Sequence, residues 1–338
     1  MNVTRAIALK KVVDVFRVAG TPVDRELARA RLPEGLEESP NEYISTILGY
    51  RFIQKCQEIE RISDLGWHSF RSLEAQDFGG TFTSGMRSCK TLNERLVLLC
   101  DVLHSESNYL RCHLLIGSKR SRFVFQDPHL DCASDYSISE WSRVFYVIRA
   151  IQMVLGGDWR PLSIGFVSTF SPSVPAHEYF RGIPLLTGQK TTWVEFPSAI
   201  LPTCTGEVSE EAFDRPAPET QMGSQTTAEL LRKLLHPYLC AGRPSVEVAA
   251  EMAGMSSRSL QRLLRREGVS FSTLLDQCSF ERACRLLGDH DLRITDIAHS
   301  VGYEDSSHFA RAFKRISGQT PRQYRRGRAL ADSAAASS

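Results

Sequence analysis

Two short stretches near the C-terminus carry side chains that could recognise base pairs. In each stretch, residues spaced three or four apart would share one face of a helix, and that face is polar and basic. In the major groove of DNA, arginine can bond guanine O6 and N7, and glutamine can bond adenine. The chemistry indicated is hydrogen bonding to bases, by Arg258, Gln261, Arg262 and Arg265 in the first stretch and by Ser306, Ser307, Arg311 and Lys314 in the second.

Motifs for other chemistry are missing from the sequence. It has no GxSxG, no HExxH, no P-loop and no GxGxxG after a strand-like run, which are common signatures of enzymes. Its nine cysteines include no CxxC pair and no Cys/His quartet, so neither a zinc site nor a disulfide framework is indicated. We expect a protein that is not an enzyme and that holds no cofactor or metal. A bifunctional enzyme and regulator is an alternative that no motif supports.

The two stretches belong to segments that repeat one another. Residues 248–270 and 296–320 match at four paired positions, with offsets of 48, 48, 49 and 50: Ala250 and Ala298, Gly254 and Gly302, Arg262 and Arg311, Gly268 and Gly318. Each segment reads as helix, glycine turn and helix, because glycine permits the sharp turn that sets two short helices at a steep angle. Units of this kind place their second helix in the major groove.

Each second helix has an apolar side opposite its polar side. The apolar residues at helical spacing are Leu260, Leu263 and Leu264 in the first unit, and Phe309, Ala312 and Phe313 in the second. Ser256 and either Asp305 or Ser306 are placed to cap these helices. One such helix alone is more often an ordinary solvated surface helix. Two matching helices in register, each after a glycine turn, favour recognition of DNA.

The residues between the two units predict a connecting helix. Phe271 to Leu287 carries apolar residues at helical spacing. A rigid helix here would fix the separation of the two reading helices. Those helices must lie about 34 Å apart to enter successive major grooves on one face of B-DNA.

Charge is distributed unevenly along a chain whose net charge is only +2. Residues 221–338 contain 17 Lys and Arg against 12 Asp and Glu, whereas residues 1–220 contain 24 against 27. A basic module joined to a mildly acidic body is typical of a nucleic-acid binder with a separate sensing domain.

The C-terminal region resembles the DNA-binding domain of bacterial AraC/XylS-family transcription regulators. The resemblance covers about Thr226 to Arg326, and the second unit carries the family signature in Ile294, Ile297, Ala298, Val301, Gly302, Tyr303, Ser307, His308, Phe309, Arg311, Phe313, Lys314, Gly318, Pro321, Tyr324 and Arg325. It implies an all-α domain with two helix-turn-helix units. It also implies base contacts from the second helix of each unit, namely from Arg258, Gln261 and Arg262 in the first and from Ser306, Ser307 and Arg311 in the second.

The two units are expected to contribute unequally. Ser306 and Ser307 are short, which predicts that the second unit reads bases weakly and that specificity comes chiefly from the first. The cluster from Arg325 to Arg328 could bind phosphates. The family resemblance further implies an activator that binds double-stranded promoter DNA and contacts RNA polymerase. An architectural DNA-binding repressor without an effector is the alternative.

The first 200 residues alternate helical and strand-like patterns, which predicts an α+β domain. Residues 109–116 and 122–125 read as paired strands across a Gly-Ser-Lys-Arg turn. Ser137 to Leu155 is the longest amphipathic helix candidate, and Ser137 with Glu140 would form a capping box at its start.

Part of this N-terminal region resembles the AraC subgroup that includes ornithine-utilisation regulators. The matching residues lie in stretches 84–96 and 157–201. The resemblance implies that the domain binds a small effector, derived from an amino acid or an amine, and forms a homodimer. The candidate residues of the effector pocket are Trp159, Arg160, Tyr179 and Trp193.

Composition places the expected domain boundaries. A stretch rich in Pro, Gly, Ser, Thr and acidic residues divides the chain, so we expect an effector-binding and dimerisation domain at 1–202, a linker at 203–225, a DNA-binding domain at 226–328 and a disordered tail at 329–338. No stretch is apolar enough to span a bilayer, and the N-terminus lacks the features of a signal peptide. The sequence therefore predicts a multidomain cytoplasmic protein without a membrane partner.

Overall fold

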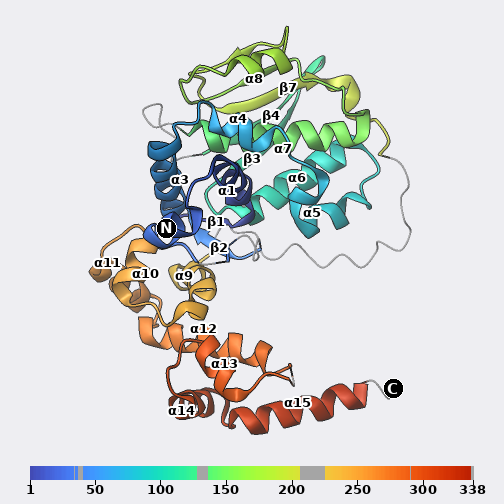
Figure 1. Cartoon of the computed structure of the whole chain (residues 1–338). Coiled ribbons are helices and arrows are strands. Elements are labelled where there is room, and N and C mark those ends of the chain that lie inside the picture. Colours follow the sequence, from blue (N-terminus) through green and yellow to red (C-terminus); the bar gives the residue numbers. More distant parts are fainter. Residues whose placement is uncertain (34, 37–40, 128–135, 206–224, 290, 336–338) are drawn as a thin grey trace.

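Two domains of different composition follow one another along the chain. The computed structural model describes residues 1–33, 35–36, 41–127, 136–205, 225–289 and 291–335. Figure 1 shows an N-terminal domain of helices and strands, with a C-terminal domain of helices alone below it. This arrangement confirms the predicted fold class, α+β followed by all-α.

A five-stranded sheet forms one layer of the N-terminal domain. Its strand order is β3-β4-β7-β5-β6, and every pair is antiparallel except β5 with β6. The strands are β3 (Arg111–Ile116), β4 (Arg120–Gln126), β5 (Ser163–Gly165), β6 (Leu185–Leu186) and β7 (Thr192–Pro197). The β3–β4 hairpin confirms the paired strands predicted from the sequence, with Cys112 opposite Phe125.

Helices form the rest of the N-terminal domain, together with a small two-stranded sheet. The elements are β1 (Val3–Arg5), α1 (Ile7–Ala19), α2 (Val23–Arg29), β2 (Tyr43–Ser45), α3 (Thr46–Glu60), α4 (Leu65–Phe70), α5 (Gly79–Met86), α6 (Leu92–Glu106), α7 (Ser137–Leu155) and α8 (Val174–Tyr179). Strands β1 and β2 pair antiparallel. In Figure 1, α7 runs between the large sheet and the group formed by α1, α4 and α6. Helix α7 therefore has protein on both sides, and most of its side chains are buried.

Helix α7 has the bounds that the sequence predicted, but the predicted capping box is wrong. Its N-cap is Tyr136, whose side chain makes no capping hydrogen bond. Glu140 turns inward instead, where its carboxylate accepts hydrogen bonds from the backbone N–H groups of Val167 and Ser168 and from the Thr192 hydroxyl, at 2.6, 3.1 and 2.5 Å. Three donors can stabilise a buried carboxylate, so Glu140 ties α7 to β7 and to the loop after β5.

The C-terminal domain consists of helices arranged around two separate apolar cores. Its elements are α9 (Thr227–Leu235), the 3-10 helix at His236–Ala241, α10 (Val246–Met252), α11 (Ser257–Arg266), α12 (Phe271–Leu286), α13 (Ile294–Ser300), α14 (Ser306–Ser317) and α15 (Pro321–Ala335). Helix α12 confirms the predicted connecting helix. Leu274 and Cys278 from its first half belong to one core, and Ala283 from its second half belongs to the other.

The ends of the two domains differ from the expected boundaries. Thr203 still accepts a hydrogen bond from the backbone of Leu92 at 3.0 Å, so the folded N-terminal domain continues past residue 202. Residues 206–224, most of the expected linker, lie outside the described residues. Helix α15 continues to Ala335, so residues 329–335 are helical rather than disordered. Their alanine-rich sequence favours helix.

Two further features concern the described residues as a group. No helix within the described ranges has the length and apolar composition needed to cross a bilayer. The same residues bring no three His, Cys, Asp or Glu side chains together as ligands for a metal ion.

Candidate nucleic-acid interface and ligand cavity

The first helix-turn-helix unit consists of α10, a glycine turn and α11. Gly254 adopts a φ of +67°, a conformation that favours glycine over other residues. Ser256 caps α11, because its hydroxyl accepts a hydrogen bond from the Ser259 backbone at 3.2 Å. Leu260 and Leu264 are completely buried and hold α11 against the core. The opposite face of α11 is left to the solvent.

The second unit repeats this plan with α13 and α14. Gly302 adopts a φ of +83° at the turn. The cap is Asp305, whose carboxylate accepts from the Ser307 backbone at 2.7 Å, which decides between the two residues that the sequence offered. Phe309 and Phe313 are buried in the second core. The two units therefore match in the glycine turn, in the capped start of the second helix and in the buried face of that helix.

The predicted base-contacting residues lie on the outer faces of α11 and α14. Exposed side chains are Arg258, Arg262, Arg265, Ser307, Arg311 and Lys314, and Gln261 and Ser306 are half-buried. In both helices the three exposed residues are spaced by four and then by three, so they share one face. The face of α11 presents three guanidinium groups. The face of α14 presents one hydroxyl, one guanidinium and one ammonium group.

A carboxylate on the connecting helix ties the two units together. Asp276 accepts a hydrogen bond from Arg243, just before α10, at 2.6 Å, and forms an ion pair with Arg315 of α14. The Arg243 guanidinium also lies 4.8 Å from the ring centroid of Tyr303, which follows the second glycine turn. These contacts use charge-assisted hydrogen bonds. They join α14 and the segment before α10 to α12.

The arginines of α15 have different surroundings. Arg326 is exposed, whereas Arg328 donates a hydrogen bond to the backbone carbonyl of Cys284 on α12 at 2.9 Å. Arg326 is therefore open to the solvent, and Arg328 helps to hold α15 against the connecting helix.

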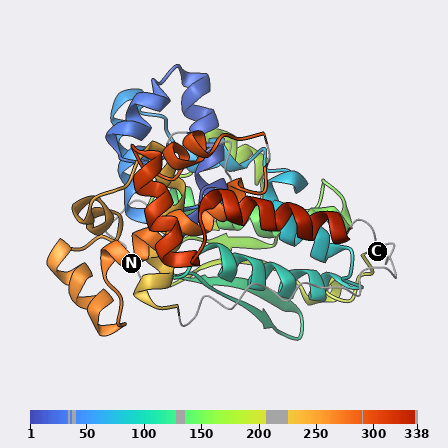
Figure 2. The same cartoon turned by 90° about the horizontal axis from the view of Figure 1, so that it is seen from below.

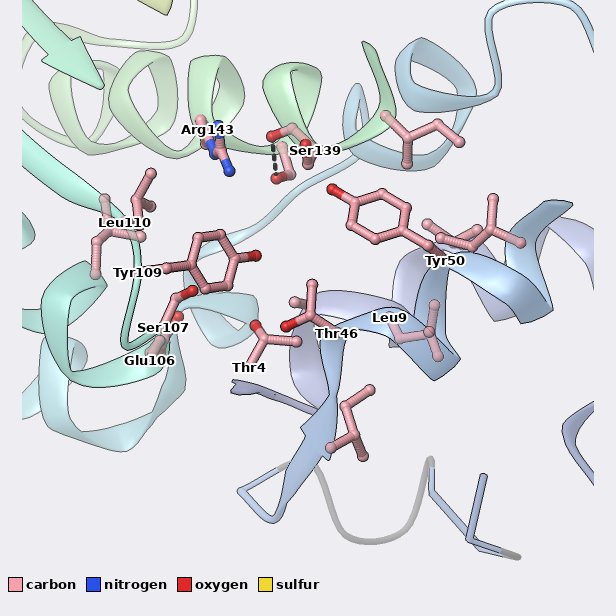
Figure 3. Close-up of a pocket in the computed structure, with 18 of the residues that line it drawn as sticks. Thr4, Leu9, Thr46, Tyr50, Glu106, Ser107, Tyr109, Leu110, Ser139 and Arg143 are labelled. Atoms are coloured by element: carbon pink, nitrogen blue, oxygen red, sulfur yellow. Dashed lines mark hydrogen bonds between the residues drawn. The ribbon is translucent and has the colours of Figure 1, made fainter. Parts of the chain in front are cut away.

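A cavity of about 110 Å³ lies inside the N-terminal domain, among α1, α3, α6 and α7. Figure 3 shows the hydroxyls of Tyr50 and Tyr109 pointing toward each other across it, with the guanidinium of Arg143 beside the Tyr109 ring. Most of the wall is apolar, and its members include Leu9, Val12, Ile44, Ile53, Phe70 and Leu110. A concave apolar site with a few polar groups is the usual form of a small-molecule pocket.

The cavity wall includes one basic and one acidic side chain, Arg143 and Glu106. Arg143 is only 5% exposed and donates to Asp127 through Nη2 at 2.7 Å. Its other terminal nitrogen, Nη1, is buried and has no hydrogen-bond acceptor among the described residues. Glu106, at the end of α6, is half-buried. Desolvation raises the pKa of its carboxyl group to about 7, against an opposing effect of Arg5.

The four residues predicted for the effector pocket lie elsewhere in the N-terminal domain. The Arg160 guanidinium lies 4.3 Å from the ring centroid of Tyr179, and Trp159 is half-buried beside them. Trp193 is in β7, where the Arg122 guanidinium lies 4.1 Å from its ring centroid. The structure thus brings Arg160 and Tyr179 together, but none of the four residues lines the cavity described above.

The first unit is in direct contact with the N-terminal domain. The Ser45 hydroxyl donates to the backbone carbonyl of Met252, the last residue of α10, at 2.6 Å. Arg51 of α3 forms an ion pair with Glu251 at 2.5 Å. Figure 1 shows α10 beneath the lower end of α3, and the red helices of the second unit lie farther away, beyond α12. In Figure 2, seen from below, these red helices stand in front of the N-terminal domain.

More contacts join α9 to the small sheet of the N-terminal domain. Glu42 bonds His236 at 3.0 Å, and the Lys233 ammonium group lies 4.7 Å from the ring centroid of Tyr43. The hydrogen bond with His236 lowers the pKa of the Glu42 carboxyl group, although partial burial opposes it. Leu234 of α9 belongs to the same apolar core as the N-terminal domain. The N-terminal and C-terminal domains therefore share an interface with polar and apolar contacts.

Family comparisons match both parts of the chain. Residues 249–327 match a family described as a helix-turn-helix domain. Residues 20–203 match a family described as the arabinose-binding domain at the N-terminus of AraC transcription regulators.

Three relatives place these matches in whole proteins. The HTH-type transcriptional regulator VirS of Mycobacterium tuberculosis is 35% identical over 96% of this chain and 96% of its own length. The HTH-type transcriptional regulator GlxA of Rhizobium meliloti is 36% identical over 27% of this chain and 32% of its own length. The transcriptional activator NphR of a Rhodococcus species is 38% identical over 23% of each chain. The chain therefore spans less than a third of two of these relatives but nearly all of VirS.

Proposed function

The chain belongs to the AraC family of transcription regulators, and we propose that it activates transcription from promoter DNA when a small molecule binds its N-terminal domain. The family places an effector-binding domain before a helix-turn-helix domain, and both are present here. One of the relatives is named as an activator. We propose residues 226–328 as the DNA-binding domain of this chain.

The observation that carries the proposal is the matched pair of exposed faces on α11 and α14. Arg258 and Arg262 stand on the first face, and Arg311 on the second. Guanidinium groups at a helix surface can form two parallel hydrogen bonds with guanine in the major groove. The first face has the larger number of such groups, so we assign it the main part of base recognition. The second face, with its short serine, mainly sets position.

Loss of one guanidinium from α11 tests this assignment. Arg262→Ala should cost about 1–3 kcal/mol of binding free energy on the preferred DNA sequence and relax the preference at one base pair. The measurement is fluorescence anisotropy of the full chain with a selected DNA site and with the same site carrying substitutions. If Arg262→Ala lowers affinity equally on every sequence, Arg262 does not read a base.

Arg326→Ala is the matched control for a phosphate contact. It should weaken binding to all sequences alike and reduce the slope of log affinity against log salt by about 0.9. Because both variants remove one guanidinium, any difference between them comes from what the arginine contacts. A sequence-dependent effect of Arg326→Ala would contradict its assignment to the backbone.

The assembly and partners of the regulator are further parts of the proposal. We propose a homodimer that binds beside a promoter, where it contacts RNA polymerase. Mass measurement of the full chain at micromolar concentration, with and without DNA, tests the dimer. A monomer under every condition would contradict it. Transcription in vitro with purified RNA polymerase tests activation.

The alternative of an architectural repressor without an effector makes a different prediction. Its DNA binding would not respond to any small molecule, and its N-terminal domain would need no cavity. The apolar cavity with a buried arginine supports the effector-responsive function instead. A promoter on which the full chain only lowers transcription, with no response to small molecules, would favour the repressor.

A further inference from the structure

The cavity of the N-terminal domain is lined mainly by apolar surface, with several polar side chains among it. Nη1 of Arg143 and the hydroxyls of Thr46 and Ser107, which all belong to lining residues, are buried, and none of the three has a hydrogen-bond partner among the described residues. Figure 3 shows Arg143 reaching the cavity from α7, on the opposite side from Thr46 and Ser107. A buried donor that makes no hydrogen bond is destabilising. An oxygen of a bound molecule beside Arg143 would remove that penalty.

The size of the cavity limits the ligand. An engineered cavity of about 150 Å³ lined by apolar residues binds benzene, and this cavity measures about 110 Å³. Its wall is formed mainly by leucine, isoleucine, valine and aromatic side chains. Because most of the surface of this wall is apolar, it favours a ligand whose own surface is mainly apolar over a sugar, which has a hydroxyl on nearly every carbon. A single ring or a short branched chain fits better.

We propose that the cavity binds a small carboxylic acid or amide with an apolar body, whose carbonyl oxygen accepts a hydrogen bond from Nη1 of Arg143. This proposal rests on the proposed function and names the class of its effector. The carbonyl oxygen lies beside Nη1 of Arg143, and the ring or branched chain lies against Leu9, Ile53 and Phe70. Asp127 already neutralises the charge of Arg143, and Glu106 also lines the cavity, so a neutral amide or the protonated form of an acid fits the site better than a carboxylate anion.

Binding of matched probes to the full chain tests the ligand class. Benzoate and benzamide carry the carbonyl oxygen, whereas benzylamine carries a cation in its place, toluene has no polar group, and arabinose has no apolar body. By calorimetry, we expect benzoate or benzamide to bind at least tenfold more tightly than the other three probes. If benzylamine or arabinose binds more tightly than both carbonyl probes, the proposal is wrong.

Two variants locate the binding site. Arg143→Met should lower the affinity for benzoate and benzamide at least tenfold, whereas Arg149→Met, on the same helix but outside the cavity wall, should leave it unchanged. Because loss of Arg143 also removes a buried hydrogen bond and ion pair with Asp127, Ala8→Phe is the second test. Ala8 lines the cavity, and a phenyl group there fills the space without removing a charge. Unchanged probe affinity in Ala8→Phe, when the variant is folded, would overturn the site.

A second observation assigns the route from the cavity to DNA. Residues of β2 and the start of α3 lie between the cavity and the first helix-turn-helix unit. Ile44, Thr46 and Tyr50 line the cavity. Ser45, Ile47 and Arg51 face the first helix-turn-helix unit. In the first unit, a Cβ atom at Gly254 would lie 2.3 Å from Cδ1 of Ile47, so a side chain there would displace the end of Ile47. We infer that this segment, residues 44–51, transmits occupancy of the cavity to α10 and α11.

The physical basis of this coupling is the shared backbone. A molecule that contacts Thr46 and Tyr50 restrains the first turns of α3. Ser45, which caps α3, also bonds the end of α10. Restraint at Thr46 therefore changes the freedom of Met252 and the glycine turn that follows it. Allosteric coupling between two sites commonly changes affinity by about 5- to 150-fold.

Separating probe binding from the DNA response tests the coupling. In the wild-type chain, saturating benzoate or benzamide should change the affinity for DNA at least threefold. Arg51→Ala combined with Ser45→Ala should bind the probe and DNA as before but lose most of that change. Lys55→Ala, which removes another exposed cation from α3, should keep the full response.

The possible failures of this experiment are distinguishable. A probe that binds without changing DNA affinity would overturn the coupling and leave the ligand class intact. A double variant that keeps the full response would overturn the route through residues 44–51. A chain that binds no DNA sequence selectively would instead contradict the proposed function itself.

Discussion

The two helix-turn-helix units share a plan, but different parts of the molecule occupy the space beside their turns. At Gly254 in the first unit, a Cβ atom would meet Ile47 of the N-terminal domain at 2.3 Å. At Gly302 in the second unit, it would meet Arg243 of the C-terminal domain itself at 2.7 Å. The same turn therefore packs against the sensing domain in one unit and against the neighbouring unit in the other.

The two copies of the repeat can therefore have different roles. The first unit has the richer guanidinium face and also the direct contact with the N-terminal domain. The second unit is fixed through Asp276 of α12, so it follows the position of the first. By the proposed route, a signal from the cavity would reach the unit to which we assign most of the base recognition. The second unit then needs no sensory contact of its own.

The largest expected effect concerns the independence of the two cores. Phe313 is 1% exposed and contacts the rings of Phe280, Phe309 and Tyr324. Phe313→Ala should destabilise the second unit by about 3–5 kcal/mol. Because its core is separate from the first core, hydrogen exchange should rise in α13 and α14 while α10 and α11 stay protected. Equal loss of protection in both units would mean that they form a single folding unit.

The next effect concerns the connection through α12. Asp276→Asn removes the charge that Arg243 and Arg315 share, and should cost about 1.5–3 kcal/mol. We expect weaker binding to DNA that carries both half-sites, with little change on a single half-site for the first unit. Glu281→Gln is the control, because Glu281 pairs with Arg232 in an exposed position and should cost less than about 1 kcal/mol. Equal effects of the two substitutions would contradict the special role of Asp276.

A smaller effect separates the two turns. Gly254→Ala and Gly302→Ala each place a side chain at a positive φ, which costs about 1–2 kcal/mol. Gly254→Ala should also displace Ile47 and reduce the response of DNA binding to benzoate or benzamide. Gly302→Ala should lower DNA affinity and keep that response. Combining Gly254→Ala with Ile47→Ala, which makes room for the new methyl group, measures how much of the effect comes from the contact.

The smallest effect concerns pH at the interface between the domains. The hydrogen bond with His236 lowers the pKa of Glu42 below its ordinary value of 4.5. Ionised Glu42 therefore stabilises the folded chain above about pH 4.5, and this contribution is lost as the pH falls through the lower pKa of the folded state. Glu42→Gln should destabilise the folded chain by less than about 1 kcal/mol at pH 6, seen as a slightly lower unfolding temperature, and the effect should shrink as the pH falls toward 3.5. A difference that grows toward pH 3.5 would reverse the assignment.

The C-terminal domain was predictable from the sequence because its determinants are local. Gly254 and Gly302, the helix caps and the apolar spacing all lie within segments of about 25 residues. Helix α12 was predictable for the same reason. What the sequence left open was which side chains join the units. The contacts of Asp276 with Arg243 and Arg315 link residues 33 and 39 positions apart.

The cavity was not predictable because its wall is drawn from many elements. Thr4, Tyr50, Glu106 and Arg143 come from β1, α3, α6 and α7, and each would be unremarkable on a single amphipathic helix or strand. Large aromatic and basic residues such as Trp159 attracted attention through type alone. One signal was available in the sequence: Arg143 lies within the apolar helix Ser137–Leu155, where a buried charge requires a partner.

Selection of preferred DNA sequences by the wild-type chain and by its Arg262→Ala and Arg311→Ala variants measures the base preference of each unit. We expect two half-sites, with stronger base preference in the half-site of the first unit. Arg262→Ala should remove one strong preference from that half-site, and Arg311→Ala should remove a weaker one from the other. A larger loss of preference in Arg311→Ala than in Arg262→Ala would contradict the claim that the first unit carries most of the specificity.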